Sequence, residues 1–320
     1  FSRIVLKHGG KPVYKFTSPG EVLYAFRDAI AGHQNLWNAG ILHRDVSINN
    51  ILIGLPGSKP GYRGLLIDLD LSVWTDPRRN PAELEIRTGT RAFQSVNVLH
   101  SYDPDRRAHS HDYLDDLESF FYVLCFIACG FDVAKPKPKD DVIAEEIRPF
   151  PIGLSEWENT NPRWAVNAKK AMYFGGRFPE RVTDVFKNAG PAFENLLDKL
   201  FYFFHGHVVR KISRARPRLT LLELKPQSAE HYKTVLTFFD EAIEEFVAFK
   251  ALKGARPLRA LPPTSLELIA TPKQTVVRVP LVDLPPNTGT IATPESRLTR
   301  KRVESDNTDE LSTAKKSRKA

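Results

Sequence analysis

The sequence predicts an α+β fold that is mainly helical, with one small β-hairpin and a disordered C-terminal tail. Apolar residues recur at helical spacing in five stretches, at 18–39, 112–127, 162–173, 192–204 and 229–250. Two short apolar runs, at 51–53 and 65–67, flank a turn that contains Pro and Gly, which is typical of a hairpin. From residue 256 on, prolines stand among Thr, Ser and Leu without periodicity, which predicts disorder.

Composition limits the classes of protein to consider. The chain has 320 residues, of which 42% are hydrophobic, so it is long enough to bury a sizeable core. Its longest apolar run, at 120–129, is too short to cross a bilayer, and we expect no membrane contact. Cys125 and Cys129 lie in this run, which argues against a disulfide framework and favours a reducing intracellular compartment.

The net charge of +8 is distributed unevenly. Residues 297–320 contain eight Lys or Arg against four Asp or Glu, so they supply +4 and the rest of the chain is only mildly basic. A further basic cluster follows a predicted helix and consists of Arg210, Lys211, Arg214, Arg216 and Arg218. A solvated face explains this cluster more simply than a contact with nucleic acid, which we do not expect as a partner.

The first predicted helix supplies packing rather than chemistry. A β-like run at 3–6 and a polar bend at 7–10 precede it. Ser18 and Pro19 mark its start and Gly40 its stop, with apolar residues at helical spacing between them. His33 lies within this helix, where a histidine is more often a hydrogen-bonded structural residue than a ligand.

The stretch 41–70 carries the chemistry. It reads ILHRDVSINNILIGLPGSKPGYRGLLIDLD, in which Asp45 is followed by Asn50 and, after the predicted hairpin, by Asp68. Phosphoryl transfer needs a carboxylate that orients the acceptor hydroxyl, and oxygen ligands that hold Mg²⁺ against the phosphates. We assign the first task to Asp45 and the second to Asn50 with Asp68, because Mg²⁺ needs only one or two carboxylates beside phosphate oxygens and waters. Residues 65–67 are expected to form a buried strand that delivers Asp68 to the metal.

The motifs of this stretch resemble those of a known family. HRD at 43–45 followed by Asn50 matches H-R-D-x-x-x-x-N, the catalytic loop of eukaryotic protein kinases. The resemblance continues through Asp68, TGTRAF at 88–93 and DDLES at 115–119. It covers roughly residues 1–250 in the family's order, which is a far stronger signal than an isolated HRD. In detail the chain is most similar to the fungal-specific group of protein-kinase-like proteins.

This resemblance implies a protein-kinase-like fold and its cofactors. Residues 1–15 would be the end of the N-terminal lobe and the hinge, 16–255 the mainly helical C-terminal lobe, and 256–320 the disordered Pro-rich tail. ATP and Mg²⁺ are the implied cofactors, with Asn50 and Asp68 as metal ligands, and a protein substrate is the implied partner.

The resemblance also implies roles for residues around this stretch. The hinge backbone would pair with the adenine edge of ATP, which implicates Lys7, His8 and Gly9. Arg44 would either pair within the fold or anchor charge in the activation segment, 68–97. The hydroxyl of Thr90 would bond Asp45 and shape the groove for a peptide acceptor, and Asp116 would hold the catalytic-loop backbone from below.

Four departures limit what the resemblance carries over. Ser47 and Asn49 stand where serine/threonine and tyrosine kinases usually have lysine and arginine, so acceptor preference stays open. The metal motif reads DLD at 68–70, with Asp in place of a glycine. SVN at 95–97 replaces Ala-Pro-Glu and lacks the carboxylate that would anchor the segment. Because the chain starts at Phe1 without a Gly-rich loop or a V-A-I-K lysine, we expect an N-terminally truncated chain.

The last part of the chain suggests where the protein acts. A charged, Pro-rich connection is expected at 134–151. Basic clusters at 300–302 and 315–319, twelve residues apart, resemble a bipartite nuclear-localisation signal. A nuclear import receptor and the nucleus are therefore candidates for partner and compartment, although a solvated basic tail explains the clusters equally well.

Three hypotheses follow. The first is a fungal-type protein kinase directed to serine or threonine, supported by Asp45, Asn50 and Asp68. The second is a pseudokinase or interaction scaffold, supported by the altered anchor motifs. The third is a small-molecule phosphotransferase of the aminoglycoside or choline type, ranked last because TGT at 88–90 and DDLES favour a protein acceptor. A Gly-rich loop and a strand lysine encoded upstream of Phe1 would favour the first over the second.

Overall fold

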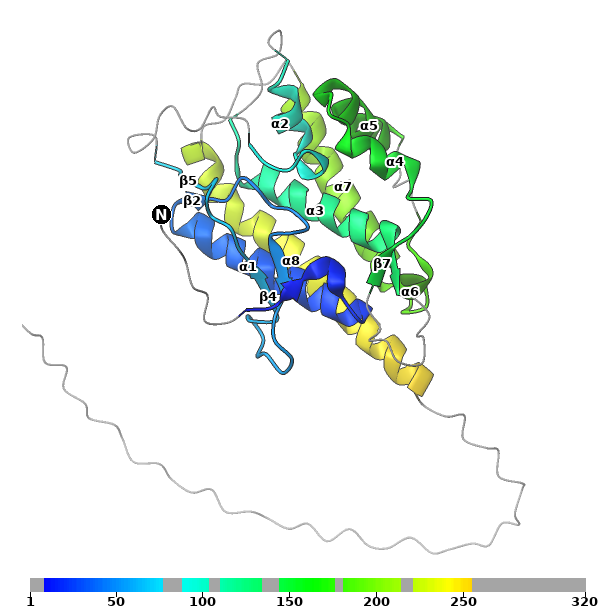
Figure 1. Ribbon diagram of the computed structural model, residues 1–320. Coiled ribbons are helices and arrows are strands. Elements are labelled where there is room, and N and C mark those ends of the chain that lie inside the picture. The colour runs from blue at the N-terminus through cyan, green and yellow to red at the C-terminus, as the bar shows by residue number, and fades with distance from the viewer. Residues whose placement is uncertain are drawn as a thin grey trace, which may run out of the picture. The chain divides into compact units, whose positions relative to one another are not determined.

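The computed structural model shows an α+β fold that is mostly helical with small sheets (Figure 1). The chain divides into two units, Phe1–Arg259 and Ala260–Ala320, and all the described residues belong to the first. The predicted hinge residues Lys7 and His8, and the tail with its basic clusters, lie outside the described residues. The structure describes residues 9–76, 88–103, 110–133, 144–175, 181–213 and 221–254.

Helices make up most of the described chain. In order they are α1 (Pro19–Asn38), α2 (Val96–His100), α3 (Tyr113–Gly130), α4 (Ile152–Ser155), α5 (Pro162–Phe174), α6 (Asp184–Lys187), α7 (Ala192–Ile212) and α8 (Leu221–Gly254). The five predicted helices are confirmed, but α7 and α8 extend further than predicted. These two helices pack against each other, and the buried Val208 continues the apolar stripe of α7 past its predicted end. None of the described helices has both the length and the apolar content to cross a membrane.

Helix α3 lies in the middle of the helical part (Figure 1). All of its residues are buried, as the nearly continuous apolar sequence predicts. Asp112 caps its N-terminus: the carboxylate accepts from the amide of Leu114 at 2.8 Å, and the Asp112 amide donates to Asp115 at 3.0 Å. Such a capping box satisfies two amides that the helix leaves unpaired, and it fixes where α3 begins.

The predicted hairpin is present and belongs to a three-stranded antiparallel sheet. Its strands are β3 (Ile51–Ile53) and β4 (Gly64–Leu66), in the register Ile51 to Leu66. β1 (Lys11–Pro12) pairs with the other edge of β3. The sequence did not predict β1, because two residues are too short to show an alternating pattern.

The prediction of a strand at 65–67 is confirmed for residues 65 and 66, but the prediction that this strand is buried is wrong. β4 ends at Leu66, residues 65–67 are half-buried, and Asp68 is exposed. Within the described residues, α1 packs closely on this sheet. A Cβ at Gly64 would lie 1.9 Å from the carbonyl oxygen of Ala25, so only glycine allows this approach.

Two further strand pairs complete the described sheets. β2 (Ile41–Leu42) pairs with β5 (Val73–Trp74), and β6 (Phe131–Val133) pairs with β7 (Ala144–Glu146). The β2–β5 pair joins the segments on either side of the predicted catalytic loop and the predicted metal motif. The charged, Pro-rich connection expected at 134–151 contains β7, a strand that the sequence did not predict. Short 3₁₀-helices lie at Val13–Lys15, Arg91–Phe93 and Glu156–Glu158.

Candidate active site

One buried carboxylate holds the backbone of the catalytic loop. Asp116, in the first turns of α3, accepts from the amides of His43 and Arg44 at 3.1 Å. It also contacts Nε2 of His33 at 2.9 Å and Nε2 of His111 at 2.8 Å. Burial disfavours the charged form, but the two histidines hold the pKa of Asp116 well below its ordinary value. The predicted contact from below is therefore present.

The histidine of α1 belongs to the same buried network. The His33 side chain is inaccessible to solvent, and its Nδ1 lies 2.8 Å from the hydroxyl of Tyr232 in α8. Both ring nitrogens are thus used within the fold. This confirms the expectation that His33 is a hydrogen-bonded structural residue.

The backbone before the predicted catalytic aspartate is strained. Arg44 has φ of 71°, in the left-handed region that a non-glycine residue occupies at a cost of about 1–3 kcal/mol. The hydrogen bond from the Arg44 amide to Asp116 and the burial of the Arg44 side chain hold this conformation. An interaction of Arg44 with charge in the activation segment stays a prediction.

The structure brings three of the predicted catalytic residues together. Oδ1 of Asp45 accepts from the amide of Thr90 at 2.9 Å and from its hydroxyl at 3.1 Å. Nδ2 of Asn50 donates to Oδ2 of Asp45 at 3.2 Å and to the Asp45 carbonyl at 2.8 Å. The predicted Thr90–Asp45 contact is therefore present, reinforced by an amide that the sequence did not implicate. The half-buried carboxylate of Asp45 is held from both oxygens.

His43 links the catalytic loop to the metal motif. Its Nε2 lies 3.0 Å from the carbonyl oxygen of Ile67, and its Nδ1 accepts from the amide of Asp45 at 3.3 Å. Burial lowers the pKa of His43, which favours the neutral ring. A neutral ring protonated on Nε2 satisfies both contacts. Sequence reasoning gave His43 no role, although its place in the HRD motif was the available signal.

Asp68 lies next to the catalytic loop. The amide of Ile67 donates to the carbonyl of Asn50 at 2.9 Å, and Asp68 follows with φ of 68°, a second strained residue. Its exposed carboxylate contacts only one described group, the Asp70 amide at 3.3 Å. Because Nδ2 of Asn50 is bound to Asp45, the amide oxygen of Asn50 is the atom that can face a cation.

This donor set fits Mg²⁺. One carboxylate and one amide oxygen are enough for a hard cation whose other ligands are phosphate oxygens and water. Among the described residues, there is no group of three or more His, Cys, Asp and Glu side chains that could hold a metal ion. Asn50 and Asp68 would therefore share a bound Mg²⁺ with its nucleotide.

The structure does not bring the described hinge residue into this group. Gly9 is exposed and borders a cavity of about 770 Å³ together with Lys11, Tyr24 and Arg63. Of the predicted site residues that the structure describes, only Gly9 lines this cavity. The pairing of the hinge with adenine stays a prediction.

The activation segment is anchored in a way that the sequence analysis did not expect. The hydroxyl of Ser95 donates to Oδ1 of Asp115 at 2.7 Å, and Nδ2 of Asn97 donates to Oδ2 at 3.1 Å. Nζ of Lys211 lies 2.9 Å from Asp115 and 2.9 Å from Asp112. The segment thus supplies the donors and α3 supplies the carboxylate. The predicted loss of the anchor is therefore wrong. The anchor is present, but its carboxylate belongs to α3 and its hydrogen-bond donors belong to the segment.

The basic cluster is only partly a solvated face. Arg210 is exposed, as this interpretation expects, whereas the Lys211 side chain is only 11% exposed. Burial opposes the charge, but Asp112 and Asp115 raise the pKa of Lys211 above its ordinary value. The clustered residues Arg214, Arg216 and Arg218 lie outside the described residues.

A second buried carboxylate supports the segment and makes stability depend on pH. Glu118 accepts from the amide of Val96 at 3.0 Å and from the hydroxyl of Tyr122. Burial raises the pKa of Glu118 from 4.5 to about 7. Between these two pH values the folded chain binds more protons at this group than the unfolded chain does. The free energy of unfolding therefore falls as pH rises through this window, by on the order of 3 kcal/mol.

Glu118→Gln should remove this dependence. Urea denaturation gives the unfolding free energy of each protein. We expect the difference, wild type minus variant, to decrease from pH 5 to pH 7 and to level off above pH 7. The matched control is Glu244→Gln on the exposed face of α8, whose difference should vary by less than about 0.5 kcal/mol. A flat difference for Glu118→Gln would contradict the assigned pKa shift.

A comparison with protein families supports the same region. The family described as fungal protein kinase matches residues 1–128, which include the catalytic loop, Asp68, Thr90 and most of α3. No curated protein matches the chain.

Proposed function

We propose that the protein transfers the γ-phosphate of ATP to a serine or threonine hydroxyl of a protein, and the match of residues 1–128 to the family described as fungal protein kinase supports this proposal. The observation that carries the proposal is the geometry of Asp45. Its carboxylate is oriented by Thr90 on one side and by Asn50 on the other. Asn50 in turn bonds the backbone of Ile67, beside Asp68.

Asp45 is the residue that acts on the acceptor. Each carboxylate oxygen can accept more than one hydrogen bond, so Oδ2 can still accept from an incoming hydroxyl. Through this contact Asp45 orients the hydroxyl oxygen towards the γ-phosphate and receives its proton. The new oxygen–phosphorus bond forms as the bond between the γ-phosphorus and the bridging oxygen of ATP breaks and ADP leaves. Thr90 is exposed and donates to the other carboxylate oxygen, Oδ1, so its position suits the edge of a peptide groove.

Asp68 and Asn50 act on the nucleotide. When bound, Mg²⁺ would neutralise charge on the phosphates during transfer. His43 positions Asp68 indirectly, because it holds the carbonyl of the preceding Ile67. The backbone contacts of Lys7, His8 and Gly9 to adenine remain part of the proposal and rest on the family resemblance.

The anchor of the activation segment favours an enzyme over a scaffold. The SVN motif at 95–97 had supported a pseudokinase because the usual carboxylate is missing. Asp115 supplies that carboxylate from the other side, and Lys211 compensates its charge. This removes one reason to expect an inactive protein. A small-molecule phosphotransferase stays the last alternative.

Nucleotide binding tests the proposal. The melting temperature of the wild-type chain should rise by several degrees with millimolar ATP and Mg²⁺, because a ligand that binds only the native state stabilises it. Asp68→Asn should remove most of this shift, because it removes the one carboxylate of the metal site. The matched control is Asp70→Asn, which keeps the amide that bonds Asp68 and should retain the shift. Equal shifts for the wild type and Asp68→Asn would refute the metal site.

A further inference from the structure

A buried lysine holds the activation segment from below. The Lys169 side chain, in α5, is inaccessible to solvent. Its Nζ donates to the carbonyl oxygens of Ala92 and Gln94, both at 2.7 Å. These carbonyls lie within and just after the 3₁₀-helix Arg91–Phe93, which begins immediately after Thr90. Lys169 therefore binds the backbone carbonyls that lie two and four residues after Thr90, the residue that contacts Asp45.

Gln94 extends this attachment to the other side of Thr90. Its Nε2 donates to the carbonyls of Thr88 at 2.8 Å and Gly89 at 3.0 Å. Its own amide donates to the carbonyl of Thr90 at 3.2 Å. With its carbonyl on Lys169, Gln94 joins the residues before and after Thr90 to one buried amine.

Segment 88–94, held in this way, packs closely against the predicted catalytic loop at Gly89. Gly89 has φ of 100°, and a Cβ there would lie 2.9 Å from the carbonyl oxygen of Arg44. A side chain could neither adopt this backbone conformation readily nor fit in the space. The contact of Thr90 with Asp45 thus depends on the close approach of Gly89 to Arg44, and the hydrogen bond from Gln94 to the Gly89 carbonyl holds Gly89 in place.

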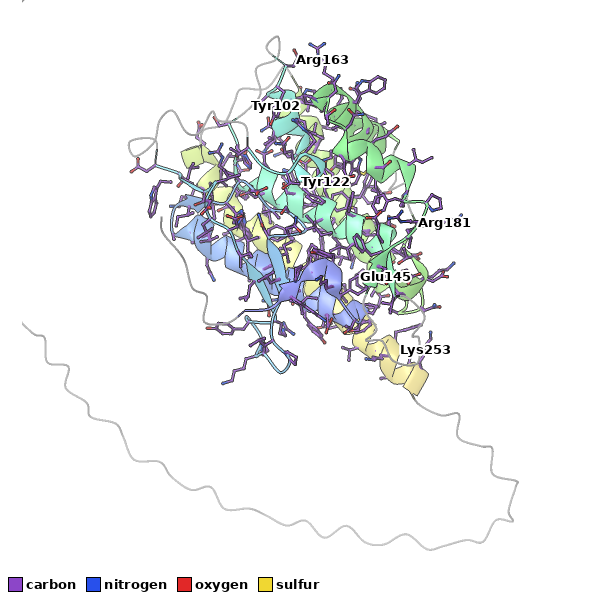
Figure 2. The ribbon with its side chains drawn as sticks, viewed as in Figure 1. Tyr102, Tyr122, Glu145, Arg163, Arg181 and Lys253 are labelled. Carbon is purple, nitrogen blue, oxygen red and sulfur yellow. The ribbon has the colours of Figure 1, made fainter. Side chains whose placement is uncertain are left out.

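The surroundings show that Lys169 is built into this position. Its Nζ lies 3.7 Å from the ring centroid of Tyr122 and 5.4 Å from that of Trp157. Figure 2 shows Tyr122 on α3. Burial lowers the pKa of Lys169 well below its ordinary value, which Glu118 opposes and Arg91 reinforces. Removing an amine from water is costly unless it is hydrogen-bonded, and here two carbonyls and an aromatic face compensate that cost.

We propose that Lys169 and Gln94 are positioning residues of the acceptor groove: they fix segment 88–94 in the conformation in which Thr90 orients Asp45. Neither residue touches the reacting atoms. The role in an acceptor groove rests on the proposed function. The attachment of Thr90 through Lys169 and Gln94 does not depend on that function, and it can be measured in the absence of catalysis.

Hydrogen exchange of the chain tests the hold directly. In Lys169→Met, which keeps the length of the side chain but removes its donors, the amides of Thr90, Phe93 and Gln94 should exchange at least tenfold faster than in the wild type. Amides in α1 and α7 should be unchanged. The matched control is Lys170→Met, the same change at the next residue, whose side chain is more exposed. Unchanged exchange of the Thr90 amide in Lys169→Met would overturn the proposal.

A second variant keeps the test decisive if Lys169→Met does not fold. Gln94→Leu removes the donors to Thr88 and Gly89 but leaves Lys169 in place, and it should raise exchange at Thr90 at least tenfold. Unchanged exchange there would equally overturn the proposal.

Kinetics separate this inference from the proposed function. If the wild type transfers phosphate, both variants should raise KM for the peptide at least tenfold and leave KM for ATP within twofold. Equal changes in the two constants would contradict a role in the groove. If the wild type transfers no phosphate, the proposed function fails, whereas the exchange data still decide whether Lys169 and Gln94 hold Thr90.

Discussion

Asp45→Asn is expected to slow phosphate transfer by the protein at least about 100-fold, the usual contribution of a positioned general base. The amide cannot receive the proton of the acceptor hydroxyl. Its Oδ1 can still accept from Thr90, so the groove should keep its shape. Initial rates at saturating ATP and peptide measure the effect.

Two controls separate lost chemistry from lost structure in this variant. The melting temperature should stay within a few degrees of the wild type, because the change exposes no buried group and alters one contact with Asn50. The shift produced by Mg²⁺ and ATP should also persist, since Asp45 is not assigned to the metal. A transfer rate equal to that of the wild type would show that Asp45 lacks its assigned role.

Asp116→Ala is expected to lower the free energy of unfolding by about 3–5 kcal/mol, the range for removing one partner of a buried charged pair. The change leaves two buried amides, those of His43 and Arg44, without their acceptor. It also removes the partner of His33 and His111. Urea denaturation at pH 7 measures the loss.

The matched control for this variant is Asp198→Ala on the exposed face of α7, which should change stability by less than about 0.5 kcal/mol. Asp116→Asn keeps one acceptor oxygen and should lose less than the alanine variant. A loss below about 1 kcal/mol for Asp116→Ala would mean that the catalytic loop does not depend on this carboxylate.

Local signals predicted the elements that carry the site. Pro and Gly between two apolar runs located the β3–β4 hairpin, and helical spacing located α1, α3 and α5. The contacts of Asp116 and Thr90 followed from the family resemblance rather than from periodicity. The two-residue strands β1, β2 and β5 carry no pattern of their own, because they exist only through pairing with distant segments.

Buried charges were the main failure of the sequence analysis. Lys211 was interpreted as part of a solvated cluster, and Lys169 was not singled out, because lysine is rarely buried. A usable signal existed for Lys169. It occupies the position in α5 that completes the buried stripe of Ala165, Val166, Met172 and Tyr173. The sequence had no local signal for the anchor in which Ser95 donates and Asp115 accepts, because this contact depends on the packing of α2 against α3.

The most direct test of the phosphotransfer site is a transfer assay. The protein is incubated with γ-labelled ATP and an array of serine, threonine and tyrosine peptides, and the label on each peptide is measured. We predict Mg²⁺-dependent label on serine or threonine hydroxyls that is lost in Asp45→Asn. The absence of label from a protein that binds Mg²⁺ and ATP would contradict the proposed activity and favour a scaffold. Label that appears only on an aminoglycoside or choline would contradict it in favour of a small-molecule phosphotransferase.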